Sequence, residues 1–272
     1  MKLFYATSTA LLLFFLQVSF TKSNAIEKVY FQDQVIETDD FKATLTDIVA
    51  TPAELKFKLV IENQSNNYLL FKPSECSVKT VVGAMSPSEK QLIVDPNSKG
   101  FRVLNFKAAS LNELRDFVFQ LKGVYAMNPD GDNAKMSTVK LNAVNEIKEN
   151  GIKLTVANLK KESVETQVKF KVSYDGSKAL LVSPSMITVK MPDGNSYANA
   201  LRKEKPSILF KGDTDNLNCK WERMPGGSAN DMQMVEMIVN FDQVFKEMSP
   251  VAIEAKEVAV AWNESLTIEK NK

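Results

Sequence analysis

Apolar and polar side chains alternate along much of the chain. The segment 55–62 reads LKFKLVIE, and the segment 168–174 reads VKFKVSY. A period of two is typical of strands that bury one face and leave the other in water, as in antiparallel sheets. Each segment is followed by turn-forming residues, NQSNN at 63–67 and DGS at 175–177. The pattern therefore predicts two long antiparallel strands, one in each half of the chain.

Four sequence blocks occur twice, in the same order. The segment 41–45 (FKATL) resembles 152–156 (IKLTV), 55–59 (LKFKL) resembles 168–172 (VKFKV), 69–74 (LLFKPS) resembles 180–185 (LLVSPS), and 77–79 (SVK) resembles 188–190 (TVK). The offset is 111 residues for the first, third and fourth blocks and 113 for the second. Small changes in loop length account for such a difference. The order and spacing predict an internal duplication.

Further strands are expected between turn signals such as PDG at 129–131 and 192–194. They span 91–94, 100–106, 117–125 and 135–141 in the first half, and 207–210, 217–221, 232–241 and 251–268 in the second, the last broken into two. Short helices are expected at 110–113 and 242–248. About seven strands per hundred residues favours an immunoglobulin-like sandwich, although closed barrels share that count. We expect an all-β protein with two tandem immunoglobulin-like antiparallel β-sandwich domains.

The first 25 residues have the three parts of an export signal. Lys2 supplies a positive charge, residues 10–20 are mostly apolar, and SNA at 23–25 is a small-x-small cleavage site. A retained anchor is the alternative, but the apolar run is too short to favour a membrane span. We therefore expect a signal peptide at 1–25, domain 1 at 26–143, domain 2 at 144–272, and an exported protein, periplasmic or extracellular, without a transmembrane segment in the mature chain.

The composition excludes several kinds of chemistry. The chain has no histidine, so catalytic triads built on histidine and zinc sites of the HExxH kind are excluded. Residues 26–143 carry 14 Lys/Arg and 15 Asp/Glu, and residues 144–272 carry 18 of each. Neither half has the positive field that nucleic-acid binding requires. Paired carboxylates can meet from any sequence separation, so glycoside hydrolysis stays open, but no pair is indicated.

Two cysteines, Cys76 and Cys219, fall in different halves of the chain. Export would place them in an oxidising compartment, where an interdomain bridge is one alternative. The simpler interpretation is two buried thiols that act as small hydrophobic residues. Cys219 fits this interpretation because it alternates with Leu217 and Trp221 in LNCKW.

Two segments contain residues that can bind metal ions. Met232, Met234 and Met237, with Met224 and Cys219 upstream, offer soft sulfur ligands of the kind that select Cu(I). The loop 127–136 contains Asn128, Asp130, Asp132 and Asn133, whose oxygen atoms can bind Ca²⁺. Core packing of the methionines and a solvated turn at 127–136 are the preferred interpretations, so we expect no metal and no cofactor.

Other polar and aromatic positions suggest surface contacts. The charge run at 202–205 (RKEK) is a wet loop or a contact for an anion or an anionic glycan. NQS at 63–65 and NES at 263–265 match the acceptor pattern for N-glycosylation. Trp221 and Trp262 are expected in the core, with stacking on sugars as the alternative if they are exposed.

The first half resembles a known class of domains. An export signal followed by F-x-A-x-L, E-L-x-F-x-L-x-I-x-N-x-S and L-x-F-x-P resembles the telokin-like, immunoglobulin-like domains of bacterial extracytoplasmic proteins. The residues of the pattern are Phe41, Ala43, Leu45, Glu54, Leu55, Phe57, Leu59, Ile61, Asn63, Ser65, Leu70, Phe71 and Pro73. The second copy keeps the apolar positions but replaces Asn63 with Asp175 or its neighbour. The resemblance implies a binding or spacer module without catalytic residues.

The expected function is a non-enzymatic exported protein that binds another extracytoplasmic protein or has a structural role in the cell envelope or outside the cell. Carbohydrate binding in glycan handling is the alternative, and an enzyme that works without histidine is a third. The sequence identifies no catalytic, cofactor-binding or metal residue. The binding residues, the ligand and the oligomeric state are left open.

Overall fold

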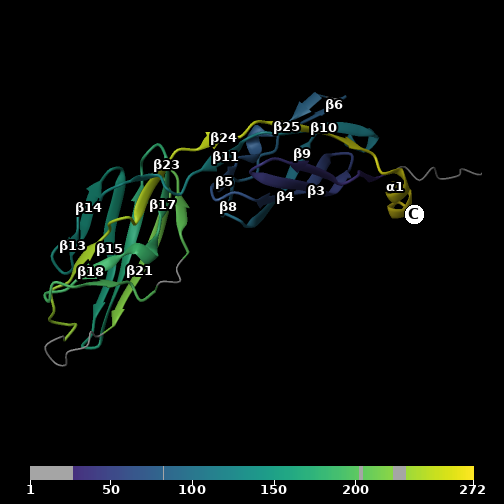
Figure 1. Ribbon diagram of the computed structural model, residues 1–272. Coiled ribbons are helices and arrows are strands. Elements are labelled where there is room, and N and C mark those ends of the chain that lie inside the picture. Colours follow the sequence, from purple (N-terminus) through teal and green to yellow (C-terminus); the bar gives the residue numbers. More distant parts are fainter. Residues whose placement is uncertain (1–26, 82, 202–204, 223–230) are drawn as a thin grey trace, which may run out of the picture.

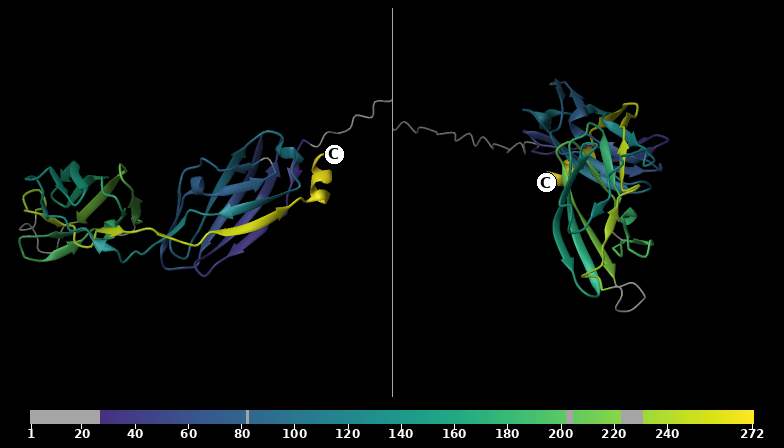
Figure 2. Two further views of the ribbon diagram at one scale, coloured as in Figure 1. Left: turned by 90° about the horizontal axis from the view of Figure 1, so that it is seen from above. Right: turned by 90° about the vertical axis from the view of Figure 1, so that its left-hand side faces the viewer.

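The computed structural model describes residues 27–81, 83–201, 205–222 and 231–272. The chain is mostly β structure with antiparallel strand pairs, as the alternation predicts. Its strands form two lobes that join at an angle (Figures 1 and 2). No helix in the described ranges is long and apolar enough to cross a membrane. The expected signal peptide, 1–25, lies outside the described residues.

The first lobe contains three sheets. The longest has the order β1-β3-β4-β9, with β2 also paired to β3, and the shorter sheets have the orders β25-β10-β6-β7 and β24-β11-β5-β8. Their bounds are β1 Val29–Tyr30, β2 Gln34–Glu37, β3 Phe41–Ala50, β4 Glu54–Asn63, β5 Tyr68–Phe71, β6 Ser77–Thr80, β7 Gly83–Met85, β8 Leu92–Val94, β9 Lys99–Lys107, β10 Asp116–Leu121, β11 Val124–Met127, β24 Val251–Ala252 and β25 Lys256–Ala261. Short 3₁₀ helices at Pro73–Glu75 and Leu111–Glu113, and the helix α1 at Glu264–Lys270, complete the lobe.

The second lobe repeats this arrangement. Its sheets have the orders β14-β15-β16-β21, β13-β22-β18-β19 and β12-β23-β17-β20. Their bounds are β12 Asp132–Asn133, β13 Val139–Lys140, β14 Glu146–Glu149, β15 Ile152–Lys161, β16 Glu165–Tyr174, β17 Ala179–Val182, β18 Thr188–Lys190, β19 Ser196–Ala198, β20 Ser207–Leu209, β21 Thr214–Glu222, β22 Ile238–Asn240 and β23 Phe245–Met248. A 3₁₀ helix at Pro184–Met186 occupies the place of Pro73–Glu75 in the first lobe.

Each lobe has its own apolar core between the long sheet and the two shorter ones. In the first lobe, the ring of Phe57 on β4 meets Phe119 on β10 edge to face, with centroids 5.1 Å apart. In the second, Phe170 on β16 meets Phe241 in the same way at 5.3 Å. Aromatic rings that cross from one layer to the other bury large apolar areas, and this burial stabilises each lobe.

The last strands of each repeat belong to the opposite lobe. The elements β2 to β11 recur in the same order as β14 to β23, and β12–β13 correspond to β24–β25. β12 and β13 follow the first repeat but pair with β23 and β22 of the second lobe. β24 and β25 follow the second repeat but pair with β11 and β10 of the first lobe. The two repeats therefore exchange their final strands within one chain.

This exchange differs from the expected domains, 26–143 and 144–272. The chain leaves the first lobe after β11, crosses at residues 128–131, and returns at 249–250. The C-terminal stretch then runs along the first lobe to α1 (Figure 2). Residues 132–141 thus lie in the second lobe and residues 251–272 in the first. The lobes are joined by two chain crossings instead of a single crossing at the expected boundary between residues 143 and 144.

A small apolar cluster lies where the lobes meet. Its buried members are Tyr68, Leu70, Met127, Ala179, Leu181 and Met248, and they come from β5 and β11 of the first lobe and β17 and β23 of the second. All four residues of β5 and all four of β17 are buried. One face of each strand enters the core of its own lobe, while the other faces the opposite lobe, which explains the unbroken apolar runs YLLF and ALLV. The cluster and the two crossings limit movement between the lobes.

The repeat register is 111 residues throughout the two long strands, so the 113-residue offset of the second block is wrong. Phe41 pairs with Asn63 in the first lobe, and Ile152 pairs with Tyr174 in the second. Tyr174, and not Asp175, therefore occupies the place of Asn63. A slip of two residues keeps every side chain on the same face of a strand, so alternation alone cannot detect the error.

Two further expectations at the C-terminal end are wrong. Residues 242–248 were expected to be helical, but Phe245–Met248 forms β23, because Phe245 and Met248 are buried between paired strands. The strand expected at 251–268 ends at Ala261, and α1 begins after Asn263. The Asn263 side chain accepts a hydrogen bond from the backbone N–H of Leu266 at 3.1 Å and so caps the helix. The 3₁₀ turn at Leu111–Glu113 agrees with the helix expected there.

Candidate functional site

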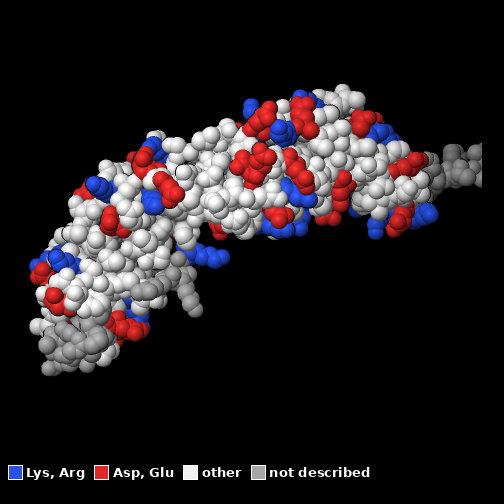
Figure 3. All heavy atoms as spheres, in the orientation of Figure 1, with Lys and Arg blue, Asp and Glu red and all other residues white. Residues whose placement is uncertain are grey.

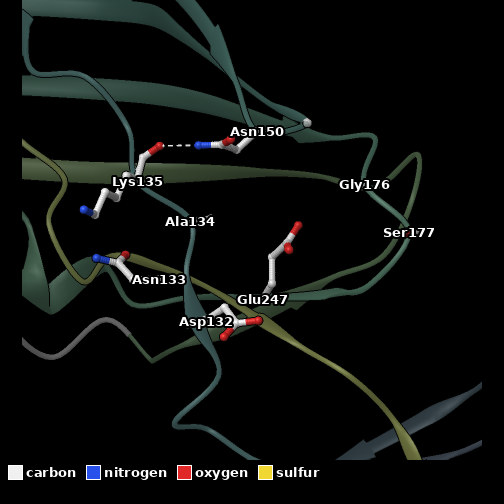
Figure 4. Close-up of a pocket in the computed structure, with 9 residues that line it drawn as sticks. Asp132, Asn133, Ala134, Lys135, Asn150, Gly176, Ser177 and Glu247 are labelled. Atoms are coloured by element: carbon white, nitrogen blue, oxygen red, sulfur yellow. Dashed lines mark hydrogen bonds between the residues drawn. The ribbon is translucent and has the colours of Figure 1, made fainter.

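A polar pocket lies at the end of the second lobe that faces the first (Figure 4). It is an open depression of about 470 Å³ between the segment 132–135, the turns 150–151 and 176–177, and Glu247 of β23. The Asn150 side chain donates to the carbonyl of Lys135 at 2.7 Å, which joins one turn to the segment beside β12. The carboxylate of Glu247 points into the space between these segments.

Glu247 is the centre of a hydrogen-bond network. The buried hydroxyl of Tyr174 donates to Glu247 Oε1 at 2.9 Å, and the ammonium of Lys178 lies 3.5 Å from Oε2. Lys178 also contacts Asp132 Oδ2 at 3.1 Å. The pKa of Tyr174 is raised, first by burial and then by the Glu247 carboxylate. The pKa of Lys178 is raised, mainly by its hydrogen bond to Asp132.

The network fastens the exchanged strand β12 to the lobe that receives it. Asp132 belongs to the first repeat, while Tyr174, Lys178 and Glu247 belong to the second. The turns that close the pocket pack tightly, since a Cβ added at Gly176 would collide with the Tyr174 hydroxyl. Both carboxylates already contact Lys178, so their arrangement stabilises the junction and leaves neither one as an unpaired general base.

The calcium alternative at 127–136 gains no support from this geometry. The carboxylate of Asp130 faces Lys246 at 3.9 Å, and that of Asp132 faces Lys178. Asn128 accepts a hydrogen bond from the backbone N–H of Asp130 at 2.9 Å, which is turn chemistry. Across the described ranges, no group of three or more Cys, Asp or Glu residues could hold a metal ion.

The sulfur residues do not converge either. Met232 and Met237 are buried in the core of the second lobe, whereas Met234 is 85% exposed. Met224 lies outside the described residues. Cys76 and Cys219 are both buried, in the cores of the first and second lobes respectively, as the simpler interpretation predicts.

The remaining sequence candidates divide between core and surface. Trp221 is buried in the core of the second lobe, and Trp262 is half-buried under the guanidinium of Arg115, 4.5 Å from its ring. Asn63 is 2% exposed and its amide donates to three backbone carbonyls, so this glycosylation pattern lies inside the fold. Of the charge run at 202–205, only Lys205 belongs to the described residues.

The outward side of the long sheet of the first lobe carries an apolar row that the sequence analysis missed. Strand pairing places Val35, Thr44, Val60 and Phe101 side by side across β2, β3, β4 and β9. Val35 is 49% exposed and Phe101 is 56% exposed, while Thr44 and Val60 are partly buried. We call the outward side of these four strands the docking face. Lys58 lies over the Phe101 ring with its Nζ 4.8 Å from the centroid.

In the second lobe, the three apolar positions of this row are occupied by polar residues. There the register aligns Glu146, Thr155, Lys171 and Asn216 across β14, β15, β16 and β21. Glu146, Lys171 and Asn216 are exposed. The fold therefore forms without valine or phenylalanine at these positions. One residue in the sequence could have indicated the apolar row. Val60 is apolar at a position where the alternating pattern calls for a polar residue, and the second repeat has Lys171 there.

Charge is mixed elsewhere on the surface. On the face shown in Figure 3, basic and acidic side chains are interspersed along both lobes, without a large block of one sign. This agrees with the balanced composition of the two halves. No family model matches the sequence, and no curated protein is significantly similar to it.

Proposed function

We propose that this chain is a non-enzymatic exported module made of two tandem immunoglobulin-like β-sandwiches, and that it binds another protein through the docking face of the first. The contrast between the two lobes carries this proposal. The same row of the same sheet is Val-Thr-Val-Phe in the first lobe and Glu-Thr-Lys-Asn in the second. Export rests on the signal at 1–25.

The physical argument is that folding does not require these apolar groups. An antiparallel sheet can leave one face in water, and that face is then usually polar. Burial of apolar area contributes about 25 cal/mol per Å², so Phe101 and Val35 gain stabilisation only when a partner covers them. An exposed apolar patch with a polar border is the usual mark of a protein interface.

The architecture adds a structural role. Two chain crossings and the apolar cluster between β5 and β17 hold the lobes at a fixed angle. A partner bound at the docking face would therefore be held at a defined distance from the far end of the second lobe. Such geometry suits a spacer or connector in the cell envelope or outside the cell.

Site-specific photocrosslinking tests the proposal. A photoreactive phenylalanine analogue replaces Phe101 in one variant and Asn216, the equivalent position of the second lobe, in the other. We expect protein adducts from position 101 and none from position 216 when each variant is exported by its native host. Equal crosslinking at both positions, or none at either, would contradict the proposed role of the docking face.

Carbohydrate binding is the second candidate, because the exposed Phe101 ring could stack on a sugar. A glycan array distinguishes the two. A glycan signal that disappears in Phe101→Asn would favour sugar binding, whereas a protein adduct from position 101 without a glycan signal favours protein binding.

A further inference from the structure

We infer that the docking face binds a second copy of this chain, face to face, about a two-fold axis that runs along the apolar row. This inference rests on the proposed function, since it names the partner of the docking face. A two-fold interface uses the same patch on both copies, so the patch must be complementary to itself in shape and in charge. The arrangement of side chains on the docking face meets both conditions.

The apolar row is self-complementary because the axis runs along it. Rotation about that axis reverses the strand direction but keeps the order of the strands. Val60 of one copy then lies opposite Val60 of the other, and Phe101 lies opposite Phe101. The apolar groups of the row cover each other, and the polar borders remain outside, as in the core and rim of protein interfaces.

The charges beside the row are also self-complementary. On one side of Val60 along β4 lies Lys58, which takes part in no ion pair among the described residues. On the other side lies Glu62, whose carboxylate contacts the ammonium of Lys99 at 2.9 Å and also lies beside Lys42, its partner in the strand register. Rotation about the row places Lys58 of each copy opposite Glu62 of the other. Two equivalent ion pairs therefore border the apolar contact, and no lysine faces its own copy.

The size of the face fits a weak dimer. The four strands of the face, β2, β3, β4 and β9, have 4, 10, 10 and 9 residues. At about 3.3 Å per residue and about 4.8 Å between strands, they give roughly 500 Å² per copy. Both copies together would bury roughly 1,000 Å², which is the size of a weak or transient interface. The dimer should therefore dissociate on dilution.

Sedimentation velocity of residues 26–272 over a range of concentrations tests this inference. We expect a reversible monomer–dimer equilibrium. The double variant Val60→Lys and Phe101→Asn, which introduces the residues of the second lobe, should be monomeric. The matched control Lys171→Ala and Asn216→Ala changes the equivalent positions of the second lobe, leaves the docking face intact and should keep the original equilibrium. Unfolding midpoints establish that each variant is folded.

A charge reversal identifies the proposed geometry. Lys58→Glu alone and Glu62→Lys alone should each raise the dimer dissociation constant about tenfold, because two symmetric ion pairs become repulsive. The combination of both reversals restores opposite charges and should return the constant to within about threefold of the original. Loss of dimerisation in either single variant without recovery in the combined one would overturn the two-fold arrangement.

Two outcomes separate this inference from the proposed function. A wild-type chain that stays monomeric to millimolar concentration, but whose position 101 crosslinks to a different protein, would overturn the second copy as partner and leave the docking face in place. A monomeric chain without any adduct at position 101 would overturn both. A dimer that is indifferent to Val60 and Phe101 would also overturn the inference.

Discussion

Leu70 and Leu181 hold the same position in the two repeats, and both are buried in the one small apolar cluster between the lobes. Each lies on a strand, β5 or β17, whose other face enters the core of its own lobe. Met127 on β11 and Met248 on β23 are likewise equivalent residues of the two repeats that are buried in this cluster. The lobes therefore meet through equivalent surfaces.

Truncation of this contact should loosen the junction. Leu70→Ala and Leu181→Ala should each lower the free energy of unfolding by about 3 kcal/mol, because each leaves a cavity in a buried cluster. The two losses should not add, since both side chains belong to the same cluster. Urea unfolding measures the losses, with the exposed Val164→Ala as control. Additive losses would show that the two leucines pack independently.

A charge in the C-terminal strand should unfold the first lobe selectively. Val260 on β25 is fully buried in the core of the first lobe, and an aspartate there would be an unpaired buried charge. We expect Val260→Asp to lower the stability of that lobe by more than about 3 kcal/mol. Trp262 reports on the first lobe and Trp221 on the second, so single-tryptophan variants resolve the two transitions by fluorescence. If the second lobe, reported by Trp221, unfolded at a lower denaturant concentration than the first, the prediction would be contradicted.

Loss of the Tyr174 hydroxyl should weaken the network around Glu247. Tyr174→Phe removes a partly buried hydrogen bond to Glu247 and should cost about 1 kcal/mol of unfolding free energy. The matched control is Tyr197→Phe, whose hydroxyl donates to the exposed Asp193 at 2.8 Å and should cost much less. Urea denaturation compares the two. Equal costs would show that the network at the pocket adds nothing to an ordinary surface hydrogen bond.

Alkaline pH should destabilise the protein through Cys76. Burial raises the pKa of this thiol to about 12, so the folded state keeps the proton when the unfolded state, with a value near 9.0, has lost it. The thiol's contribution to stability is complete below pH 9 and falls as pH rises toward about 12, by about 1.4 kcal/mol per pH unit. Urea unfolding between pH 8 and pH 11.5 should show a shallower decline in Cys76→Ala. Identical slopes in both proteins would contradict this prediction, as would rapid reaction of native Cys76 with a thiol reagent at pH 8.

The alternating pattern was sufficient to predict the all-β class and most strand positions, and the four repeated blocks predicted the duplication. β4 and β16 follow it directly, because each buries every second residue. β23 was harder to predict, since Phe245 and Met248 are three residues apart and this spacing also suits a helix. Their burial depends on pairing with β17, a strand more than 60 residues away, which no local pattern contains.

The exchange of strands and the docking face depend on information beyond a single segment. The backbone of a strand such as β25 can form equivalent hydrogen bonds with β10 or with β22. The sequence of β25 alone therefore does not show which of the two strands it pairs with. The docking face became apparent only when the register placed Val35, Val60 and Phe101 in one row. Comparison of Val60 with Lys171 would have indicated it, but the incorrect 113-residue offset aligned Val60 with Ser173 instead.

The completion of the first lobe by the C-terminal segment can be tested with one engineered disulfide. Gln120 on β10 and Glu257 on β25 are direct partners in the register, and their side chains are joined by a hydrogen bond of 3.1 Å. Cysteines at both positions should form a bridge within one chain under oxidising conditions, because directly paired residues have the required separation. Mass spectrometry of the unreduced protein should then find peptides around positions 120 and 257 linked in the monomer. Two free thiols at these positions in the folded monomer would contradict the exchange of strands.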